Sequence, residues 1–159
     1  MIDDADRAVL RRCVELAAQA LAAADEPFGS VLVDRDGVRR AEDRNRVAGG
    51  DHTRHPELAL ARWAAAHLTP RQRAQATVYT SGEHCPMCAA AHGWVGLGRI
   101  VYASSSQQLV AWLDELGVPP PPVRPLPIRE VVPSVPVDGP DPELAEEVRA
   151  LHRRRHAGS

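Results

Sequence analysis

The chain has 159 residues and a mass of 17.2 kDa, which fits one globular domain of ordinary size. Its 44% hydrophobic and 25% charged residues exclude disorder along the whole chain, and no apolar run approaches the ~20 residues that span a bilayer. The 19 basic residues are all arginine and stand against 21 acidic ones, so the net charge of −2 argues against a nucleic-acid-binding protein.

The chain contains three cysteines, Cys13, Cys85 and Cys88. The acidic first residues lack the apolar segment of an export signal, so we expect a cytoplasmic protein. An odd cysteine count in that compartment argues against a disulfide framework. The close pair instead indicates a metal site or a catalytic thiol, whereas the apolar surroundings of Cys13 predict a buried, inert side chain.

The first third of the chain predicts a helix followed by a β-hairpin. Apolar residues recur at intervals of three or four over residues 5–24, which is typical of an amphipathic helix. Residues 28–33 predict a strand, and the turn after it ends in Asp36-Gly37. Because Asp-Gly favours tight hairpins, we expect a second, antiparallel strand over residues 38–46.

The middle of the chain alternates between helices and strands. Pro56 and Glu57 are typical of a helix start. The expected elements are a helix over residues 56–68, a strand over 77–80, a helix from 86 to 94, a strand over 99–103 and a helix over 106–116. Such alternation predicts an α/β domain with helices layered on a partly parallel sheet.

The composition changes after residue 116. Residues 117–159 form a proline-rich extension in which residues 128–132 could form an edge strand and residues 140–155 predict a final helix. The extension is too apolar for a linker. We therefore expect it to pack on the domain of residues 1–116 or on a partner subunit.

Two short motifs, His55-Pro56-Glu57 and Cys85-Pro86-Met87-Cys88, carry the candidate chemistry. Each falls at a predicted helix N-terminus, where free N–H groups and the helix dipole favour thiolates. Two sulfurs and one imidazole nitrogen suit zinc, and three protein ligands leave a fourth position for water, as catalytic sites require. A redox-active cysteine pair is the rival interpretation, but it leaves His55 and Glu57 unexplained.

Glu57 completes the constellation. Two residues from His55, its carboxylate could reach a water at the metal without binding the metal itself. Such a water loses its proton near pH 7, and a neighbouring carboxylate can accept and deliver that proton. Glu57 is therefore the candidate general acid and base.

These motifs resemble those of the cytidine/deoxycytidylate deaminase superfamily, whose signature joins His-x-Glu to Pro-Cys-x-x-Cys. The segments Pro27 to Val33 and Tyr79 to Cys88 are similar to the guanine and cytosine deaminase branch. The resemblance covers about residues 5–116. It implies a three-layer fold with helices on both faces of a mixed sheet, a Zn²⁺ ion held by His55, Cys85 and Cys88, and a homodimer.

The resemblance also implies substrate-binding residues. Asn45 stands where the family has a substrate-binding asparagine, and Trp94 where similar guanine deaminases have a substrate-packing tryptophan. From the residues alone, Asn45 could be a turn residue and Trp94 a core residue. Phe28 either lines the pocket or packs in the interior.

The chain departs from the family pattern at two positions. Pro56 stands where a small residue is usual, which the first position of a helix tolerates. His84 stands in place of the usual proline, where it either faces the substrate or supplies a fourth metal ligand. A fourth ligand from His84 or His52 would close the site and make the chain a non-enzymatic, zinc-stabilised binding module.

The sequence therefore predicts a zinc-dependent hydrolytic deaminase of a small aminated heterocycle, with guanine or a similar free base as substrate. Cytosine, an aminotriazine or a nucleoside are the alternatives. A tRNA-editing adenosine deaminase shares the zinc motifs, but the net charge and the proline-rich tail argue against it. We expect neither a nucleic-acid partner nor a membrane partner.

Overall fold

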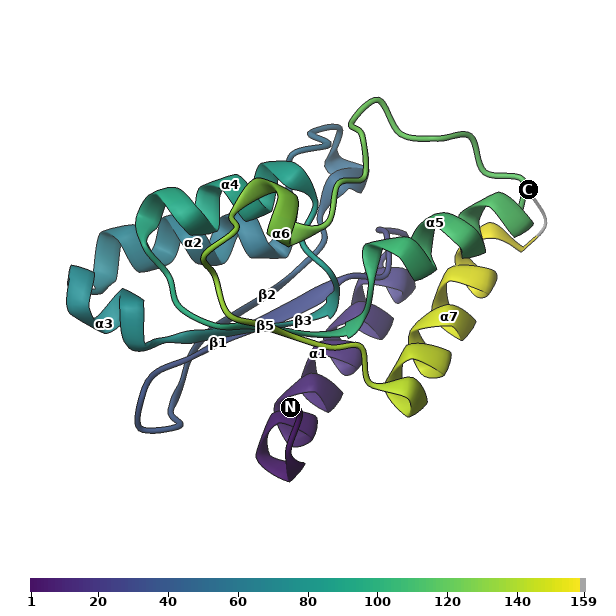
Figure 1. Cartoon of the computed structure of the whole chain (residues 1–159). Helices are drawn as coiled ribbons and strands as arrows, with labels where there is room; N and C mark the ends of the chain where they lie inside the picture. The colour runs from purple at the N-terminus through teal and green to yellow at the C-terminus, as the bar shows by residue number, and fades with distance from the viewer. Residues whose placement is uncertain (158–159) are drawn as a thin grey trace.

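The computed structural model describes residues 1–157 and centres on one mixed five-stranded sheet (Figure 1). Its strands are β1 (Gly29–Val33), β2 (Arg39–Arg44), β3 (Thr77–Gly82), β4 (Ile100–Ser104) and β5 (Val137–Asp138), in the order β2-β1-β3-β4-β5. Strand β1 pairs antiparallel with β2 and β3, whereas β3, β4 and β5 run parallel. The predicted hairpin and the partly parallel sheet are both confirmed.

Helices cover both faces of the sheet (Figure 1). One face carries α2 (Pro56–His67), α3 (Pro70–Gln75), α4 (Pro86–Val95) and α6 (Ile128–Val131). The other face carries α1 (Asp4–Ala22), α5 (Ser106–Glu115) and α7 (Pro142–His156), and a short 3₁₀ helix spans Val47–Gly49 in the loop after β2. This arrangement confirms the three-layer α/β fold.

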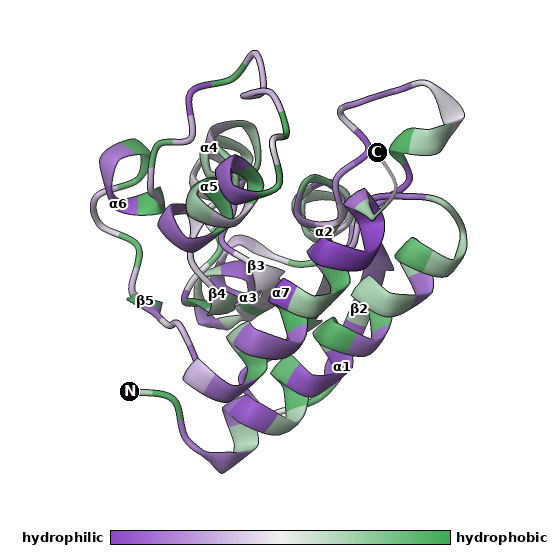
Figure 2. Cartoon of the chain, turned by 90° about the vertical axis from the view of Figure 1, so that its right-hand side faces the viewer, coloured by the Kyte–Doolittle hydropathy of each residue, from purple (hydrophilic) through white to green (hydrophobic). Residues whose placement is uncertain are grey.

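Both faces of the central strands are buried, because each alternating set of side chains meets a different helical layer. Val31 and Tyr79 pack with α1 and α7, while Leu32 and Val78 pack with α2 and α4. Along α1 and α7, hydrophobic and hydrophilic residues alternate as amphipathic helices require (Figure 2). The sheet thus holds two cores apart, one on each face.

One element of the extension differs from the sequence prediction. Residues 128–132 do not form an edge strand; Ile128–Val131 is the single-turn helix α6, and the edge strand is β5, Val137–Asp138. Pro127 lies at the N-cap of α6, and the fully buried Ile128 fills the space beside α4. The β-branched composition suggested a strand, but tertiary packing decides the conformation of so short a segment.

Sequence reasoning also missed α3, although Thr69 and Gln72 form a capping box at its start. No helix within the described residues is long and apolar enough to cross a membrane. The division of the chain into residues 1–116 and 117–159 stays a prediction, and its last two residues lie outside the described part.

Within residues 1–157, the extension packs on its own chain. Leu144, Ala145, Val148 and Leu151 of α7 belong to the same buried cluster as α1 and β4. Asp141 caps α7 by accepting from Leu144 N at 3.0 Å, and its other oxygen accepts from Arg7 Nε of α1 at 2.9 Å. Helix α7 is thereby part of the main core.

This packing predicts the stability of a tail variant. Leu144 is fully buried, so Leu144→Ala should lower the free energy of unfolding by about 2–5 kcal/mol through lost burial and a residual cavity. The exposed Glu146 on the same helix provides the control, since Glu146→Ala should change stability by less than about 0.5 kcal/mol. Urea unfolding measures both; equal effects would contradict the packing described.

Candidate metal centre and active site

Two helices begin at the same place in the fold, and their first residues carry the candidate ligands. His55 is the N-cap of α2, and Cys85 is the N-cap of α4, with Cys88 in the first turn of that helix. A proline occupies the first position of each helix, and no side chain caps either one. The remaining N–H groups and both positive dipole ends are therefore available to stabilise thiolates.

The three predicted ligands converge. The His55 Nδ1 atom lies 3.5 Å from Cys85 Sγ and 3.6 Å from Cys88 Sγ, and the three ligand atoms all lie within 4.8 Å of one another. Zinc–sulfur bonds of about 2.3 Å and zinc–nitrogen bonds of about 2.0 Å at tetrahedral angles separate N and S by roughly 3.6 Å. The donor set therefore fits zinc, with His55 binding through Nδ1.

The local electrostatics prepare the cysteines for this role. A hydrogen bond from Cys88, together with one from His55, lowers the pKa of the Cys85 thiol to about 4 despite its burial. The same hydrogen bond and burial raise the pKa of Cys88, and the bond to Cys85 raises that of His55. Zinc binds cysteines as thiolates, so its binding would displace any proton left on the pair.

Glu57, the predicted acid and base, lies inside the fold at 6% exposure. Its Oε1 atom accepts from Thr80 Oγ1 at 2.8 Å and from Ser30 Oγ at 3.2 Å. Burial raises the pKa of Glu57, and the bond from Thr80 partly offsets this effect. A raised pKa favours the protonated form more than in an exposed carboxyl group, which suits a group that must deliver a proton.

Sequence reasoning missed the two hydroxyl partners of Glu57. Ser30 and Thr80 are directly opposite each other in the β1–β3 pair, both are fully buried, and their oxygens lie 2.9 Å apart. Ser30 is the lone polar side chain of the otherwise apolar strand β1, which is the signal that could have found it. Thr80 shares its strand with Thr77 and Ser81, so it carries no such signal. Strands β1 and β3 therefore supply the floor of the site.

The Asn45 side chain is 1% exposed, and only one of its two polar atoms has a hydrogen-bond partner among the described residues. Its Oδ1 atom accepts from Val47 N at 3.1 Å, which is the turn role that the sequence left open. Its Nδ2 atom has no partner among the described residues. A buried amide group with unused donors is what a substrate-binding role requires, so that role stays a prediction with structural support.

Phe28 and Trp94 occupy contrasting environments. The half-buried Phe28 ring lies over Gly82 at the end of β3, where an added Cβ would stand 3.1 Å from Phe28 Cε1. Trp94 is 89% exposed at the last turn of α4, so the interpretation as a core residue is wrong. Its predicted contact with substrate stays a prediction.

His84 lies in the interior rather than among the metal ligands. Its ring packs edge-on against His92 at a centroid distance of 5.4 Å, and neither of its ring nitrogens has a partner within the described residues. Burial lowers the pKa of His84 well below its usual range. Among residues 1–157 the ligand cluster comprises only three residues, so neither His84 nor His52 closes it. A contact of His84 with substrate stays a prediction.

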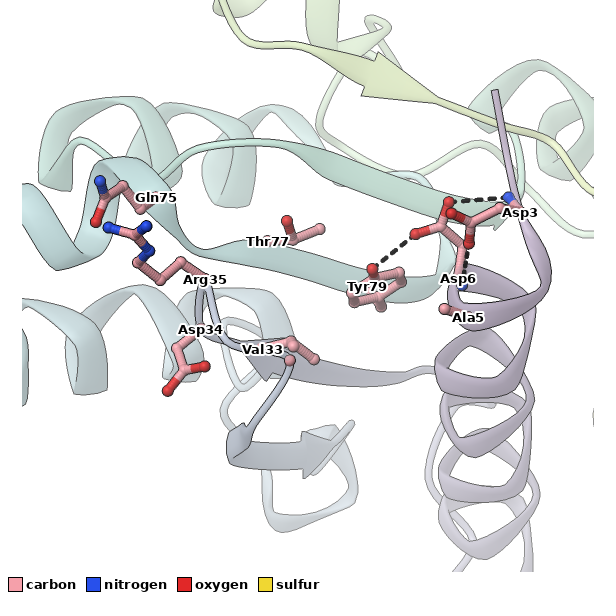
Figure 3. A pocket seen from close by; sticks show the side chains of 10 residues that line it. Asp3, Ala5, Asp6, Val33, Asp34, Arg35, Gln75, Thr77 and Tyr79 are labelled. Carbon is pink, nitrogen blue, oxygen red and sulfur yellow. Dashed lines mark hydrogen bonds between the residues drawn. The ribbon is translucent and has the colours of Figure 1, made fainter.

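A hollow of about 540 Å³ lies at the end of the sheet opposite the metal cluster, where β3 begins (Figure 3). Its acidic group Asp6 already has partners, because Tyr79 donates to Asp6 Oδ1 at 2.7 Å and Arg99 donates to both Asp6 oxygens. The bonds from Arg99, Asp3 and Tyr79 outweigh burial and lower the pKa of Asp6 to about 2. This network stabilises the fold and offers no reactive group.

Comparison with known proteins agrees with the site. The model of the cytidine and deoxycytidylate deaminase zinc-binding region matches residues 3–104, which contain all three ligands and Glu57. The chain belongs to this family. The family match and the ligand geometry together confirm a zinc-dependent deaminase and make the redox interpretation of the cysteine pair unnecessary.

Two relatives of this deaminase are named for a free base, whereas another, from Haemophilus influenzae, is a tRNA-specific adenosine deaminase. A probable cytosine deaminase of Schizosaccharomyces pombe is 32% identical over 120 residues, which are 76% of this chain and 73% of that protein. A guanine deaminase of Bacillus subtilis is 38% identical over 97 residues, 60% of this chain and 62% of that protein. The solved structure of NE0047 with 2,6-diaminopurine superposes with a TM-score of 0.77 at 26% identity, covering 100% of this chain and 85% of that one.

The ligand set predicts how metal content responds to substitution. Cys85→Ser should reduce zinc from one ion per chain to well below half, because a serine hydroxyl stays protonated where a thiolate is required. Cys13→Ala is the matched control: it removes the buried third thiol, which lies outside the ligand cluster, and should keep the zinc. Elemental analysis of both purified proteins measures the effect; a Cys85→Ser protein with full zinc would contradict the assignment.

Proposed function

We propose that this deaminase hydrolyses guanine or a similar free purine base and releases ammonia. The observation that carries the proposal is the buried Glu57 carboxyl group beside the His55, Cys85 and Cys88 cluster. The choice of a purine is supported by the similarity to the Bacillus guanine deaminase and to NE0047, whose structure contains 2,6-diaminopurine. Cytosine is the second candidate, favoured by the Schizosaccharomyces relative.

In this reaction, water replaces the exocyclic amino group of the base. Bound zinc supplies a Lewis acid that makes water a nucleophile near neutral pH. Glu57 removes a proton from that water, and we assign the transfer to Oε2 because the two hydroxyl groups meet Oε1. The same oxygen then delivers the proton to a ring nitrogen. Glu57 next takes the second proton from the hydroxyl group now on the ring carbon and passes it to the amino group, so that ammonia leaves as the carbonyl forms.

The surroundings of Glu57 favour both its proton uptake from water and its proton delivery to the base. Burial raises the pKa of Glu57, so the carboxyl group gives up its proton less readily than an exposed one and can act as an acid. Ser30 and Thr80 fix one oxygen and so the orientation of the other. The unused Nδ2 donors of Asn45 would bind an acceptor of the base, and Phe28 would pack against its ring.

Ammonia release by the zinc-loaded protein tests the proposal. The compounds are guanine, cytosine, adenine, guanosine, cytidine and an aminotriazine, with a tRNA included to test the editing alternative. Glu57→Gln should keep one zinc per chain and lower kcat by about 10³-fold or more, since it removes the proton carrier. The exposed Glu130 supplies the control, because Glu130→Gln changes charge equally and should leave turnover intact.

The outcomes separate the candidate functions. Turnover of guanine that Glu57→Gln abolishes would support the proposal, and turnover of another compound would move the substrate to that class. A fully active Glu57→Gln protein would contradict the role of Glu57. Absence of turnover with every compound, with one zinc per chain, would contradict the choice of a free purine base and place the substrate outside this set.

We also propose that the protein is a homodimer through the surface around Trp94. An indole group at 89% exposure is unfavourable in water, and Met87 and Ala90 lie half-buried on the same helix. Together they form an apolar stripe along α4 that a second copy could cover. A cytoplasmic location is part of the same proposal, because all three cysteines are free and both ligand thiols must stay reduced.

Trp94→Glu should therefore produce a monomer, since it places a charge in the interface core. Sedimentation equilibrium would measure a dissociation constant raised at least about tenfold relative to wild type. Val110→Glu, at a half-exposed apolar position on α5, is the control and should leave assembly unchanged. A monomeric wild-type protein at micromolar concentration would contradict the proposal.

A further inference from the structure

Phe28 connects the candidate site to the far end of the chain. It stands two residues before Ser30, its carbonyl oxygen accepts from Asn45 N at 3.0 Å, and its ring lies over Gly82. Of these neighbours, Ser30 contacts Glu57 and Asn45 is a predicted substrate-binding residue. The position of this ring therefore helps to define the space that a substrate would fill.

The C-terminal helix holds the Phe28 ring from the side. His152 of α7 meets Phe28 edge-on, with ring centroids 5.2 Å apart and planes inclined by 64°. Trp112 of α5 also contacts His152, with ring centroids 6.2 Å apart. Three rings from distant parts of the chain thus form one cluster, and edge-to-face contacts of this kind fix the orientation of the rings.

His152 has the character of a buried aromatic contact. It is 3% exposed, and its ring makes aromatic contacts but no hydrogen bond within the described residues. Burial and the neighbouring His156 lower the pKa of His152 to about 4, so the ring is neutral at pH 7. Leu151 and Val148 anchor the same helix in the main core, so the ring is held rigidly.

We infer that His152 of α7 is a positioning residue for substrate binding, acting through Phe28. This inference rests on the proposed function, yet α7 lies outside residues 3–104, the region that matches the family. His152 itself touches neither the ligand cluster nor Glu57. Its role is to keep the Phe28 ring where it packs against the base.

Steady-state kinetics on the substrate found in the ammonia assay test this role. His152→Ala should raise KM by about tenfold and change kcat by less than about threefold, because it frees a ring that contacts substrate without touching the reacting atoms. His152→Tyr keeps an aromatic ring, so its KM should lie close to the wild-type value. The neighbouring, exposed Arg153 supplies the control, and Arg153→Ala should match wild type.

A double-mutant cycle separates positioning from a general loss of structure. In a Phe28→Leu background, His152→Ala should raise KM by less than about twofold, since the ring through which it acts is gone. Additive effects of the two substitutions would overturn the inference. A fall in kcat at unchanged KM in His152→Ala would overturn it as well.

A second readout does not depend on turnover. Phe28 is the single phenylalanine of the chain, so fluorophenylalanine labelling gives one ¹⁹F resonance that reports on this ring alone. His152→Ala should shift and broaden that resonance, whereas Arg153→Ala should not. If the wild-type protein deaminates nothing yet these spectra behave as expected, the proposed function fails while the ring contact stands. Identical spectra for all three proteins would overturn the inference.

Discussion

The site depends on one constraint: α2 and α4 must begin side by side, so that His55 and Cys85 meet at 3.5 Å. Both ligands are N-cap residues, whose extended backbone turns the side chain toward the helix entrance. With proline at the first position of each helix, the remaining N–H groups and the dipole favour negative charge at this point. Backbone geometry thus favours negative charge at this point before any metal binds, and the bonds from Cys88 and His55 lower the pKa of Cys85 further.

The central sheet supplies the hydrogen bonds that the buried carboxyl group of Glu57 requires, because an ionised carboxyl group is costly to bury. Moving one charge from water into the protein interior costs several kcal/mol. Each hydrogen bond to the charged group stabilises it by about 1.5–3 kcal/mol. The antiparallel register of β1 and β3 places Ser30 opposite Thr80, and both hydroxyls reach the same oxygen of Glu57. The two hydrogen bonds offset only part of the cost of burying the charge. The pKa of Glu57 therefore stays raised, which favours its role as a proton donor.

The separation of interacting residues along the chain explains what the sequence could and could not predict. His55, Glu57, Cys85 and Cys88 were found because each motif is compact and carries its own helix-start signals. Ser30 and His152 were missed, because their roles depend on pairing across 50 residues in one case and 124 in the other. Residues 128–132 have strand-like composition but form α6, since burial of Ile128 outweighs local preference. Local chemistry was predictable, whereas long-range packing was not.

Glu83 shows how the extension and the metal site are joined. It lies two residues before Cys85, and its carboxylate accepts from Ser106 N at 2.9 Å and from Ile128 N at 2.8 Å. One side chain therefore ties the ligand loop to the start of α5 and to the start of α6. Any movement of the proline-rich segment would break a charge-assisted bond beside the ligands, so that segment and the metal loop are held in place together. The prolines between α5 and α6 reinforce this coupling, since they limit the freedom that the segment would gain by detaching.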